Sequence, residues 1–187
     1  MGPPVSNTPP DPGVTEALTQ IYEAHFDHVW RALRRFGVES RHLEDVAQEV
    51  FVVVHRRLPD FQAGRPIKPW LTGIAFRCAA DHRGRASVRR EQNTEEIELV
   101  DDGANAEELL DRARAKDLVY RALAQLNDDQ RLVFVMHDLD GCSMPEIAAV
   151  VDVPLNTLYS RLRLARAHFT RAVTELKDGG ALVDART

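Results

Sequence analysis

The residues with the clearest capacity for molecular recognition lie near the C-terminus, in LNTLYSRLRLAR, residues 155–166. At about 100° per residue, a helix here has one apolar face, and Asn156, Ser160 and Arg163 lie on the opposite face. Amide and hydroxyl groups can bind base edges, and arginines can neutralise phosphates. No acid occurs from residue 155 to residue 174. The pattern favours DNA binding over the alternative, an amphipathic helix with a solvated basic face.

A helix-turn-helix is expected to hold this face in place. Ser143 and Glu146 have the spacing of a capping box and predict the start of a short helix over residues 144–151. Asp152-Val153-Pro154 then forms the turn before a second helix, residues 155–176. On that second helix Leu158, Leu162, Ala165 and Phe169 form the buried side. A short, well-packed helix of this kind fits the major groove of duplex DNA.

A possible protein-docking face occurs earlier, in LEDVAQEVFVVVHRRL, residues 43–58. Helical periodicity turns a valine stripe toward the core and turns four residues outward together: Asp45, Gln48, Glu49 and Val52. A row of acids, an amide and one aliphatic fits a protein partner. A merely solvated acidic face is equally consistent with these residues.

KPWLTGIAFRCAADHRGR, residues 68–85, predicts a second nucleic-acid surface. Its expected outward residues are Gly73, Phe76, Arg77 and Ala80, with Trp70, Arg83 and Arg85 at the edges. Aromatic rings among arginines are typical of single-strand binding, where bases stack and phosphates are neutralised. Core packing of Trp70 is the alternative, and an exposed Phe can be ordinary.

Catalysis and metal binding find little support in the sequence. His25 and His28 stand three residues apart on a helix, without further ligands nearby, and the remaining histidines are scattered. Cys78 and Cys142 have no metal-ligand spacing, so reduced cytosolic thiols are expected. No paired carboxylates, activated nucleophile or phosphate loop emerges. The sequence predicts a protein that is not an enzyme and that needs no metal or cofactor.

Charge is distributed unevenly along the 187 residues, whose formal net charge is -5. Residues 14–90 hold 13 Lys and Arg against 9 Asp and Glu, a net +4. Residues 91–118 hold 3 Lys and Arg against 10 Asp and Glu, a net -7. Because the acid is concentrated in one middle segment, overall acidity does not exclude nucleic-acid binding elsewhere.

Apolar residues recur at intervals of three and four residues, without strand-like alternation, so the chain is predicted to be all-α. We expect two small helical domains joined by an acidic linker, the C-terminal one containing the helix-turn-helix. The expected segments are a disordered leader 1–13, a domain 14–90, the linker 91–111, a domain 112–177 and a disordered tail 178–187. The expected helices are 15–36, 40–58, 69–85, 112–126, 128–137, 144–151 and 155–176. No apolar run is long enough for a membrane span, so no membrane insertion is expected.

In their order and spacing these segments resemble the bacterial RNA polymerase sigma factors of the extracytoplasmic-function (ECF) group, which keep conserved regions two and four. LEDVAQEVF resembles the part that docks on the beta-prime clamp of polymerase. FQAGRPIKPWLTGIAFRCAADHRGR resembles the part that melts and reads the minus-ten element. LNDDQRLVFVMHDLDGCSMPEIAAVVDVPLNTLYSRLRLAR resembles region four, which ends in the minus-thirty-five recognition helix. The resemblance covers roughly residues 15–175.

The resemblance implies a cytoplasmic initiation factor that binds core polymerase through the beta-prime clamp and the beta flap, and also binds promoter DNA. Many relatives are held inactive by an anti-sigma factor, a further possible partner. The implied clamp residues are Asp45, Gln48, Glu49 and Val52. The implied minus-ten residues, including a loop from Phe61 to Lys68 that captures a flipped base, are Phe61, Arg65, Lys68, Trp70, Phe76, Arg77, Arg83 and Arg85. The implied minus-thirty-five residues are Asn156, Thr157, Tyr159, Ser160, Arg161, Arg163 and Arg166.

Three residues depart from the usual pattern of that family. Arg77 stands where Asn is frequent, which alters the expected minus-ten preference. Asp152 replaces the turn Gly, and Asp tolerates the left-handed conformation better than most residues. Leu164 replaces a frequent Arg and removes one phosphate contact.

Other functions remain open from the residues alone. A conventional helix-turn-helix regulator would bind duplex DNA without polymerase, but no dimerisation helix or ligand pocket is evident. A structural adaptor would leave the basic helix without a purpose. The acidic linker also suggests a hypothesis of its own, that it mimics nucleic acid inside the polymerase channel.

Overall fold

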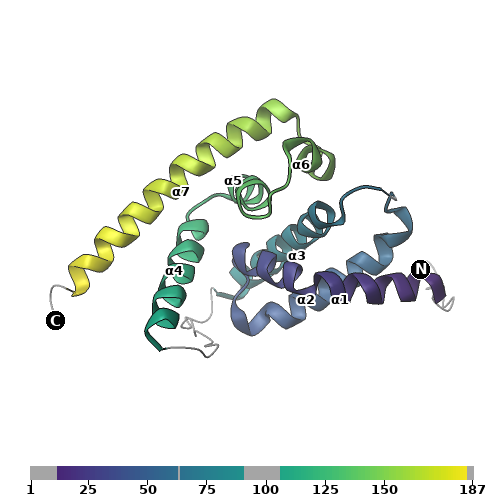
Figure 1. Cartoon of the computed structure of the whole chain (residues 1–187), viewed down its shortest axis with the longest axis horizontal. Helices are drawn as coiled ribbons and strands as arrows, with labels where there is room; N and C mark the ends of the chain where they lie inside the picture. Colours follow the sequence, from purple (N-terminus) through teal and green to yellow (C-terminus); the bar gives the residue numbers. More distant parts are fainter. Residues whose placement is uncertain (1–11, 63, 91–105, 185–187) are drawn as a thin grey trace.

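The structure is a computed structural model that describes residues 12–62, 64–90 and 106–184. In these ranges every regular element is helical, as predicted (Figure 1). The N-terminal unit contains α1 (Pro12–Arg35), η1 (Ser40–His42), α2 (Leu43–Arg57), η2 (Leu58–Asp60) and α3 (Ile67–Arg90). The C-terminal unit contains α4 (Ala106–Ala124), α5 (Asp128–Phe134), η3 (Val135–Leu139), α6 (Met144–Val151) and α7 (Leu155–Asp184).

Several boundaries differ from the sequence prediction. Helix α1 begins inside the expected leader, and α4 begins at Ala106, inside the expected linker. Helix α7 continues to Asp184, although disorder was expected from residue 178 and glycines at 179 and 180 disfavour a helix. The expected helix 128–137 ends early, because its last turn widens into the π-helical turn η3. The rest of the predicted leader and the acidic centre of the linker lie outside the described residues.

The N-terminal unit is a three-helix bundle in which α1, α2 and α3 each pack on the other two. Val46, Val50 and Val54 of α2 are buried, as the valine stripe predicted. Gly37 ends α1 with a φ of +83°, a conformation that favours glycine. The backbone N–H of Gly37 donates to the carbonyl of Arg34 at 3.0 Å and closes the helix end.

In the C-terminal unit, α4, α5 and α6 pack around α7. The predicted apolar side of α7 is confirmed for Leu158, Leu162 and Ala165, which are buried, and Phe169 is half-buried against the core. Ser143 and Glu146 form the predicted capping box, and the hydrogen bond from the Ser143 backbone lowers the pKa of Glu146. Asp152 ends α6 in the left-handed conformation, with φ 54° and ψ 47°.

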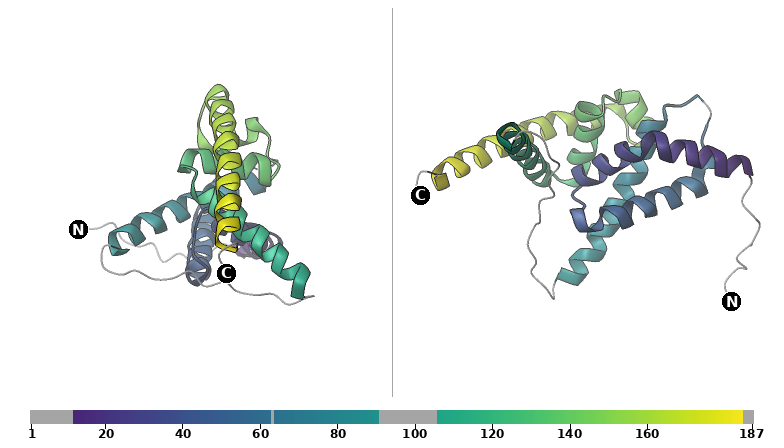
Figure 2. Two further views of the ribbon diagram at one scale, coloured as in Figure 1. Left: turned by 90° about the vertical axis from the view of Figure 1, so that its left-hand side faces the viewer. Right: turned by 60° about the horizontal axis from the view of Figure 1, so that its bottom comes forward.

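The two units pack against each other, and their buried side chains form one continuous core. Helix α6 crosses α3, and α4 approaches α1 (Figure 2). At the second of these contacts Arg34 of α1 lies over the ring of Tyr120 of α4. At the crossing of α6 and α3, a Cβ on Gly73 would approach Val150 Cγ1 to 2.4 Å, so a larger residue does not fit there. The prediction that Gly73 faces outward is therefore wrong. Gly73 lies on the side of α3 that faces away from the N-terminal bundle, but α6 of the C-terminal unit covers that side.

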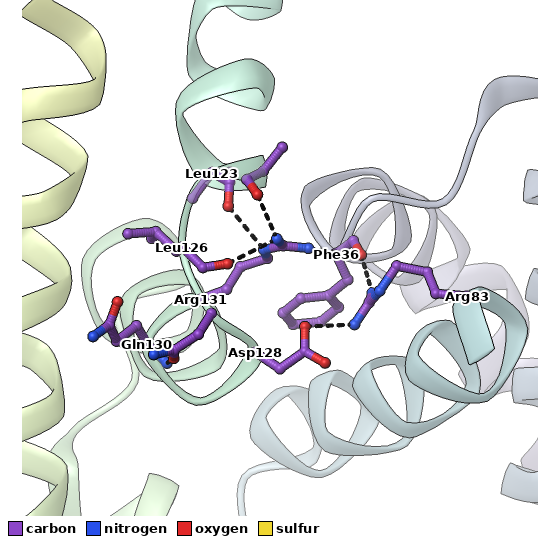
Figure 3. Close-up of polar contacts among 9 residues, drawn as sticks. Phe36, Arg83, Leu123, Leu126, Asp128, Gln130 and Arg131 are labelled. Atoms are coloured by element: carbon purple, nitrogen blue, oxygen red, sulfur yellow. Dashed lines mark hydrogen bonds and ion pairs between the residues drawn. The ribbon is translucent and has the colours of Figure 1, made fainter. Parts of the chain in front are cut away.

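A second polar contact between the units centres on the carbonyl of Phe36, which follows α1 (Figure 3). Arg131 of α5, only 7% exposed, donates to this carbonyl at 3.4 Å. Arg131 also donates to the carbonyls of Leu123, Ala124 and Leu126 at 2.8, 3.0 and 2.9 Å. From the other side Arg83 of α3 donates to Phe36 and pairs with Asp128 at 2.7 Å.

The guanidinium of Arg131 therefore donates to carbonyls at and just after the end of α4. Its fork of N–H groups adds donors where the helix runs out of them, although the Leu123 carbonyl also accepts from the backbone N–H of Leu126 at 3.1 Å. Burial lowers the pKa of Arg131, and the neighbouring charge of Arg83 lowers it further.

Replacing Arg131 by alanine should lower the free energy of unfolding by about 2–4 kcal/mol. A buried acceptor that loses its donor costs roughly 1–3 kcal/mol, and several acceptors share this one side chain. Urea unfolding followed by circular dichroism measures the change. Arg121→Ala is the matched control on α4, because its ion pair with Asp117 is exposed and should contribute less than about 1 kcal/mol. An equal decrease in the free energy of unfolding of the two variants would contradict the stabilising role of the Arg131 hydrogen bonds.

Candidate polymerase and nucleic-acid surfaces

The exposed face of α2 is arranged as the sequence predicted. Asp45, Gln48 and Glu49 are exposed, and Val52 is 50% exposed, a high value for a large aliphatic residue. They stand outward because the opposite side of α2 fills the core of the bundle. One acid of the face is already paired within the chain, since Glu49 accepts from Arg85 at 2.8 Å. That hydrogen bond raises the pKa of Arg85.

The predicted minus-ten residues do not form a single cluster, but half of them do. The rings of Phe61 and Trp70 lie 4.7 Å apart, centre to centre. Together with Arg65 and Arg77 they line one side of a cavity of about 540 Å³. Stacking rings beside two arginines suit a nucleobase and its phosphate.

The other four predicted minus-ten residues lie elsewhere. Phe76 is half-buried and packs edge-on against Phe36, so the outward orientation expected for it is wrong. Arg83 bridges to the C-terminal unit, and Arg85 is paired with Glu49. Lys68 is exposed in the first turn of α3. Burial lowers the pKa of both His25 and His28, and the nearby charge of Lys68 lowers each further.

The face of α7 that the sequence assigned to the minus-thirty-five element is open. Its exposed residues include Asn156, Thr157, Tyr159, Ser160 and Arg163. Tyr159 is 57% exposed.

The other two predicted arginines of α7 are held by acids. Arg161 pairs with Asp129 at 2.6 Å, and Arg166 binds both carboxylate oxygens of Asp138. The hydrogen bond from Arg166 lowers the pKa of Asp138. These pairs fix the direction of the two side chains and neutralise part of their charge.

Sequence reasoning missed a buried polar cluster that joins the units. Asp140, at the end of η3, accepts from Arg35 of α1 at 2.6 Å and from Thr72 of α3 at 3.2 Å. Thr72 is within 2.8 Å of His28 Nε2. Burial lowers the pKa of His28, which opposes its protonation. Because Arg35 and Asp140 are 105 residues apart, no local pattern could have indicated this cluster.

Other reactive groups in the described ranges give no catalytic arrangement. No group of three His, Cys, Asp or Glu side chains there could hold a metal ion. Cys78 and Cys142 are both buried, and burial raises the pKa of each thiol to about 11, so neither is an active nucleophile near neutral pH. None of the helices in those ranges has the length and apolar character needed to cross a membrane.

Comparison with protein families matches both units of the chain. Residues 21–89 match the family model "Sigma-70 region 2", and residues 116–169 match "Sigma-70, region 4". The ECF RNA polymerase sigma-E factor of Escherichia coli K12 is 30% identical over 160 residues, covering 81% of this chain and 84% of that protein. The RNA polymerase sigma-H factor of Pseudomonas aeruginosa is 28% identical over 151 residues, covering 76% and 78%.

Solved structures with the same fold extend the comparison. CnrH, solved in complex with the cytosolic domain of CnrY, aligns with a TM-score of 0.58 and 27% identity over 92% of this chain and 91% of that one. The sigma factor RpoE of Bartonella quintana, solved with the anti-sigma factor NepR, aligns with a TM-score of 0.65 over 85% and 98%. Its 18% identity supports the fold alone. From its two matched regions and its relatives, this chain belongs to the ECF family of RNA polymerase sigma factors, which are transcription initiation factors and not enzymes.

Proposed function

We propose that this sigma factor uses three separate surfaces: α2 for core polymerase, α3 with its preceding loop for the minus-ten element, and α7 for the minus-thirty-five element. The observation that carries this proposal is the exposure of the α2 and α7 residue sets, each on a helix whose opposite side is core. Binding surfaces of this kind require rigid support, and the helical bundle supplies it. The proposal places the protein in the cytoplasm, where polymerase works.

The α2 surface fits a basic protein partner. Asp45 and Glu49 present two carboxylates, and the half-exposed Val52 supplies apolar area beside them. Acids of this kind steer association and orient the partner, while the aliphatic group contributes desolvation. We assign this surface to the beta-prime clamp and infer that the C-terminal unit contacts the beta flap.

The cavity beside α3 fits an unstacked base. Phe61 and Trp70 offer rings for stacking, and Arg65 and Arg77 offer positive charge for the backbone. Flipping a base costs a few kcal/mol, which stacking of about 1–3 kcal/mol per base can offset. Capture of melted bases at this cavity would stabilise the open promoter. Arg77, in place of the more frequent Asn, is expected to alter which base is preferred.

On α7, base reading is assigned to the open residues Asn156, Thr157, Ser160 and Arg163. Arg161 and Arg166 are better suited to the flanking phosphates, because their acid partners already fix where the guanidinium groups lie. Leu164 is 40% exposed and supplies no charge on this side.

An anti-sigma factor is a further candidate partner. CnrH was solved with CnrY, and RpoE of Bartonella quintana was solved with the anti-sigma factor NepR. We infer that a protein of this class binds the present chain. Co-purification with a tagged copy of this chain from its own host, followed by mass spectrometry, tests that inference.

Run-off transcription with core polymerase on promoters randomised at both elements tests the whole proposal. The expected result is enrichment of two sequence motifs about two helical turns apart. A conventional helix-turn-helix regulator would instead select one duplex motif without polymerase. Selection in the absence of core enzyme, with no transcript in its presence, would overturn the proposal.

Reversing the charge of the α2 face, with Asp45→Lys and Glu49→Lys, should weaken binding to core polymerase at least about tenfold. Two attractive contacts become repulsive, and a rim charge typically acts through association rate and salt dependence. Titration of labelled protein with core enzyme measures the affinity. Glu16→Lys with Glu23→Lys makes the same change in net charge at exposed positions on α1. Equal affinity of the two double variants would count against the docking face.

Arg163→Ala should reduce transcription only from promoters that carry the minus-thirty-five element. Loss of a direct base contact costs about 1–3 kcal/mol, or roughly 5- to 150-fold. The matched control is Arg171→Ala, farther along α7, whose arginine is exposed and pairs with Glu175. Transcript yields on promoters with and without the element separate the two variants. An equal loss of transcript from both promoters would indicate that Arg163 contacts a phosphate and not a base.

A further inference from the structure

We propose that His42 and His82 form a binding site for a divalent transition-metal ion of the zinc, nickel or copper class. One imidazole nitrogen from each ring would bind the ion, and water would fill the remaining positions. The site lies at the junction of η1 and α2, beside α3. It goes beyond the proposed binding of polymerase and promoter and does not depend on it.

The first support is the distance between the two rings. The ring centres of His42 and His82 lie 4.9 Å apart, with 54° between the ring planes. In imidazole sites a metal such as zinc lies about 2.0–2.1 Å from each nitrogen. Two rings that bind one ion at angles of about 90–110° then have centres roughly 4.5–5.2 Å apart. The backbone therefore already holds the two rings at the separation that one shared ion requires.

The second support is that the ring nitrogens of this pair are unused. Three other histidines place a ring nitrogen within hydrogen-bond distance of a neighbouring side chain: His28, His137 and His168. His42 and His82 make no such bond to any residue that the structure describes. Both residues are half-buried, and neither has a buried nitrogen without a partner, so their nitrogens reach solvent. An ion entering from solvent thus finds available lone pairs.

The third support is the charge state of the pair, because a metal ion binds the neutral imidazole. Burial lowers the pKa of His82, and the neighbouring charge of His42 lowers it further. Arg85 and Arg83 act in the same direction, and Glu49 opposes them. Near neutral pH these effects favour the neutral ring of His82, which can donate a lone pair. The arginines also disfavour a cation held by charge alone.

The ligand atoms decide which class of ion fits. Imidazole nitrogen suits zinc, copper and nickel, whereas Mg²⁺ and Ca²⁺ prefer oxygen ligands. Structural zinc sites usually have four protein ligands. In the described ranges no group of three His, Cys, Asp or Glu side chains could hold a metal. A site of two histidines with open positions is therefore exchangeable, and its occupancy follows the concentration of the free ion.

The position of the pair gives a bound ion an effect on stability. His42 is the residue directly before α2, and His82 belongs to α3, so one ion would join two helices of the N-terminal unit. A ligand that binds the folded chain and not the unfolded chain stabilises the folded state by mass action. Thermal melting therefore reports on the site independently of a direct binding measurement.

Isothermal titration of the untagged full chain with Zn²⁺ measures the binding. Both His42→Gln and His82→Gln should weaken the tightest Zn²⁺ site at least about tenfold, because glutamine offers no imidazole nitrogen. The matched control replaces two other histidines, His55→Gln with His168→Gln, and should keep the native affinity. Mg²⁺ should give no comparable binding to the native chain.

Thermal melting with and without Zn²⁺ supplies the second readout. The melting temperature of the native chain should rise with Zn²⁺, and the rise should be absent in His42→Gln. Circular dichroism confirms that each variant is folded before titration. If His82→Gln does not fold, His42→Gln decides the question, since His42 lies at a helix junction on the surface of the bundle and is not part of its core.

Three results would overturn the proposal. Equal Zn²⁺ affinity of the native chain, His42→Gln and His82→Gln would leave the pair as an ordinary ring contact. Loss of the tightest site in a His25→Gln, His28→Gln variant alone would place the metal elsewhere on α1. A native chain that binds no Zn²⁺ would remove the site altogether.

Discussion

The carbonyl of Phe36 is the point on which the arrangement of the two units depends. It lies at the negative end of α1, where a helix attracts cations, and arginines reach it from both sides. Arg131 belongs to the C-terminal unit and simultaneously closes α4, while Arg83 belongs to α3 and continues to Asp128 at the start of α5. Three helix ends are therefore joined by two side chains. The path of α5, and with it the positions of α6 and α7, depends on this junction.

Charge pairing within the chain neutralises several arginines of the surfaces that we propose for binding. Arg85 is paired with Glu49, Arg161 with Asp129 and Arg166 with Asp138. Each pair joins residues from different elements, so it orients the arginine and also neutralises part of its charge. Surface pairs of this kind add little stability, and their main effect is on geometry.

The spacing of residues along single helices predicted those features that depend only on neighbouring residues. The outward set on α2, the buried side of α7, the capping box at Ser143 and the left-handed Asp152 all result from spacing and side-chain chemistry, and all are present. Gly73 and Phe76 were misplaced because their surroundings come from the other unit and from the end of α1. Asp140 was missed for the same reason, since Arg35 and Thr72 are distant in sequence, and so was the contact of Arg131 with Phe36. Helix α7 extended past its predicted end because two glycines lower helix propensity without forbidding the helix.

The π-helical turn η3 has a consequence for how this gene can change over time. It places Asp138 against Arg166 of the same unit and Asp140 against Arg35 of the other, although the two acids are only two residues apart. Deleting one residue from such a turn rotates the next part of the chain by about 100° and shortens the turn by about 1.5 Å. Neither ion pair would survive that rotation. Residues in this stretch can be exchanged, but its length is fixed, so lineages descending from this chain should diverge here by substitution and not by insertion or deletion.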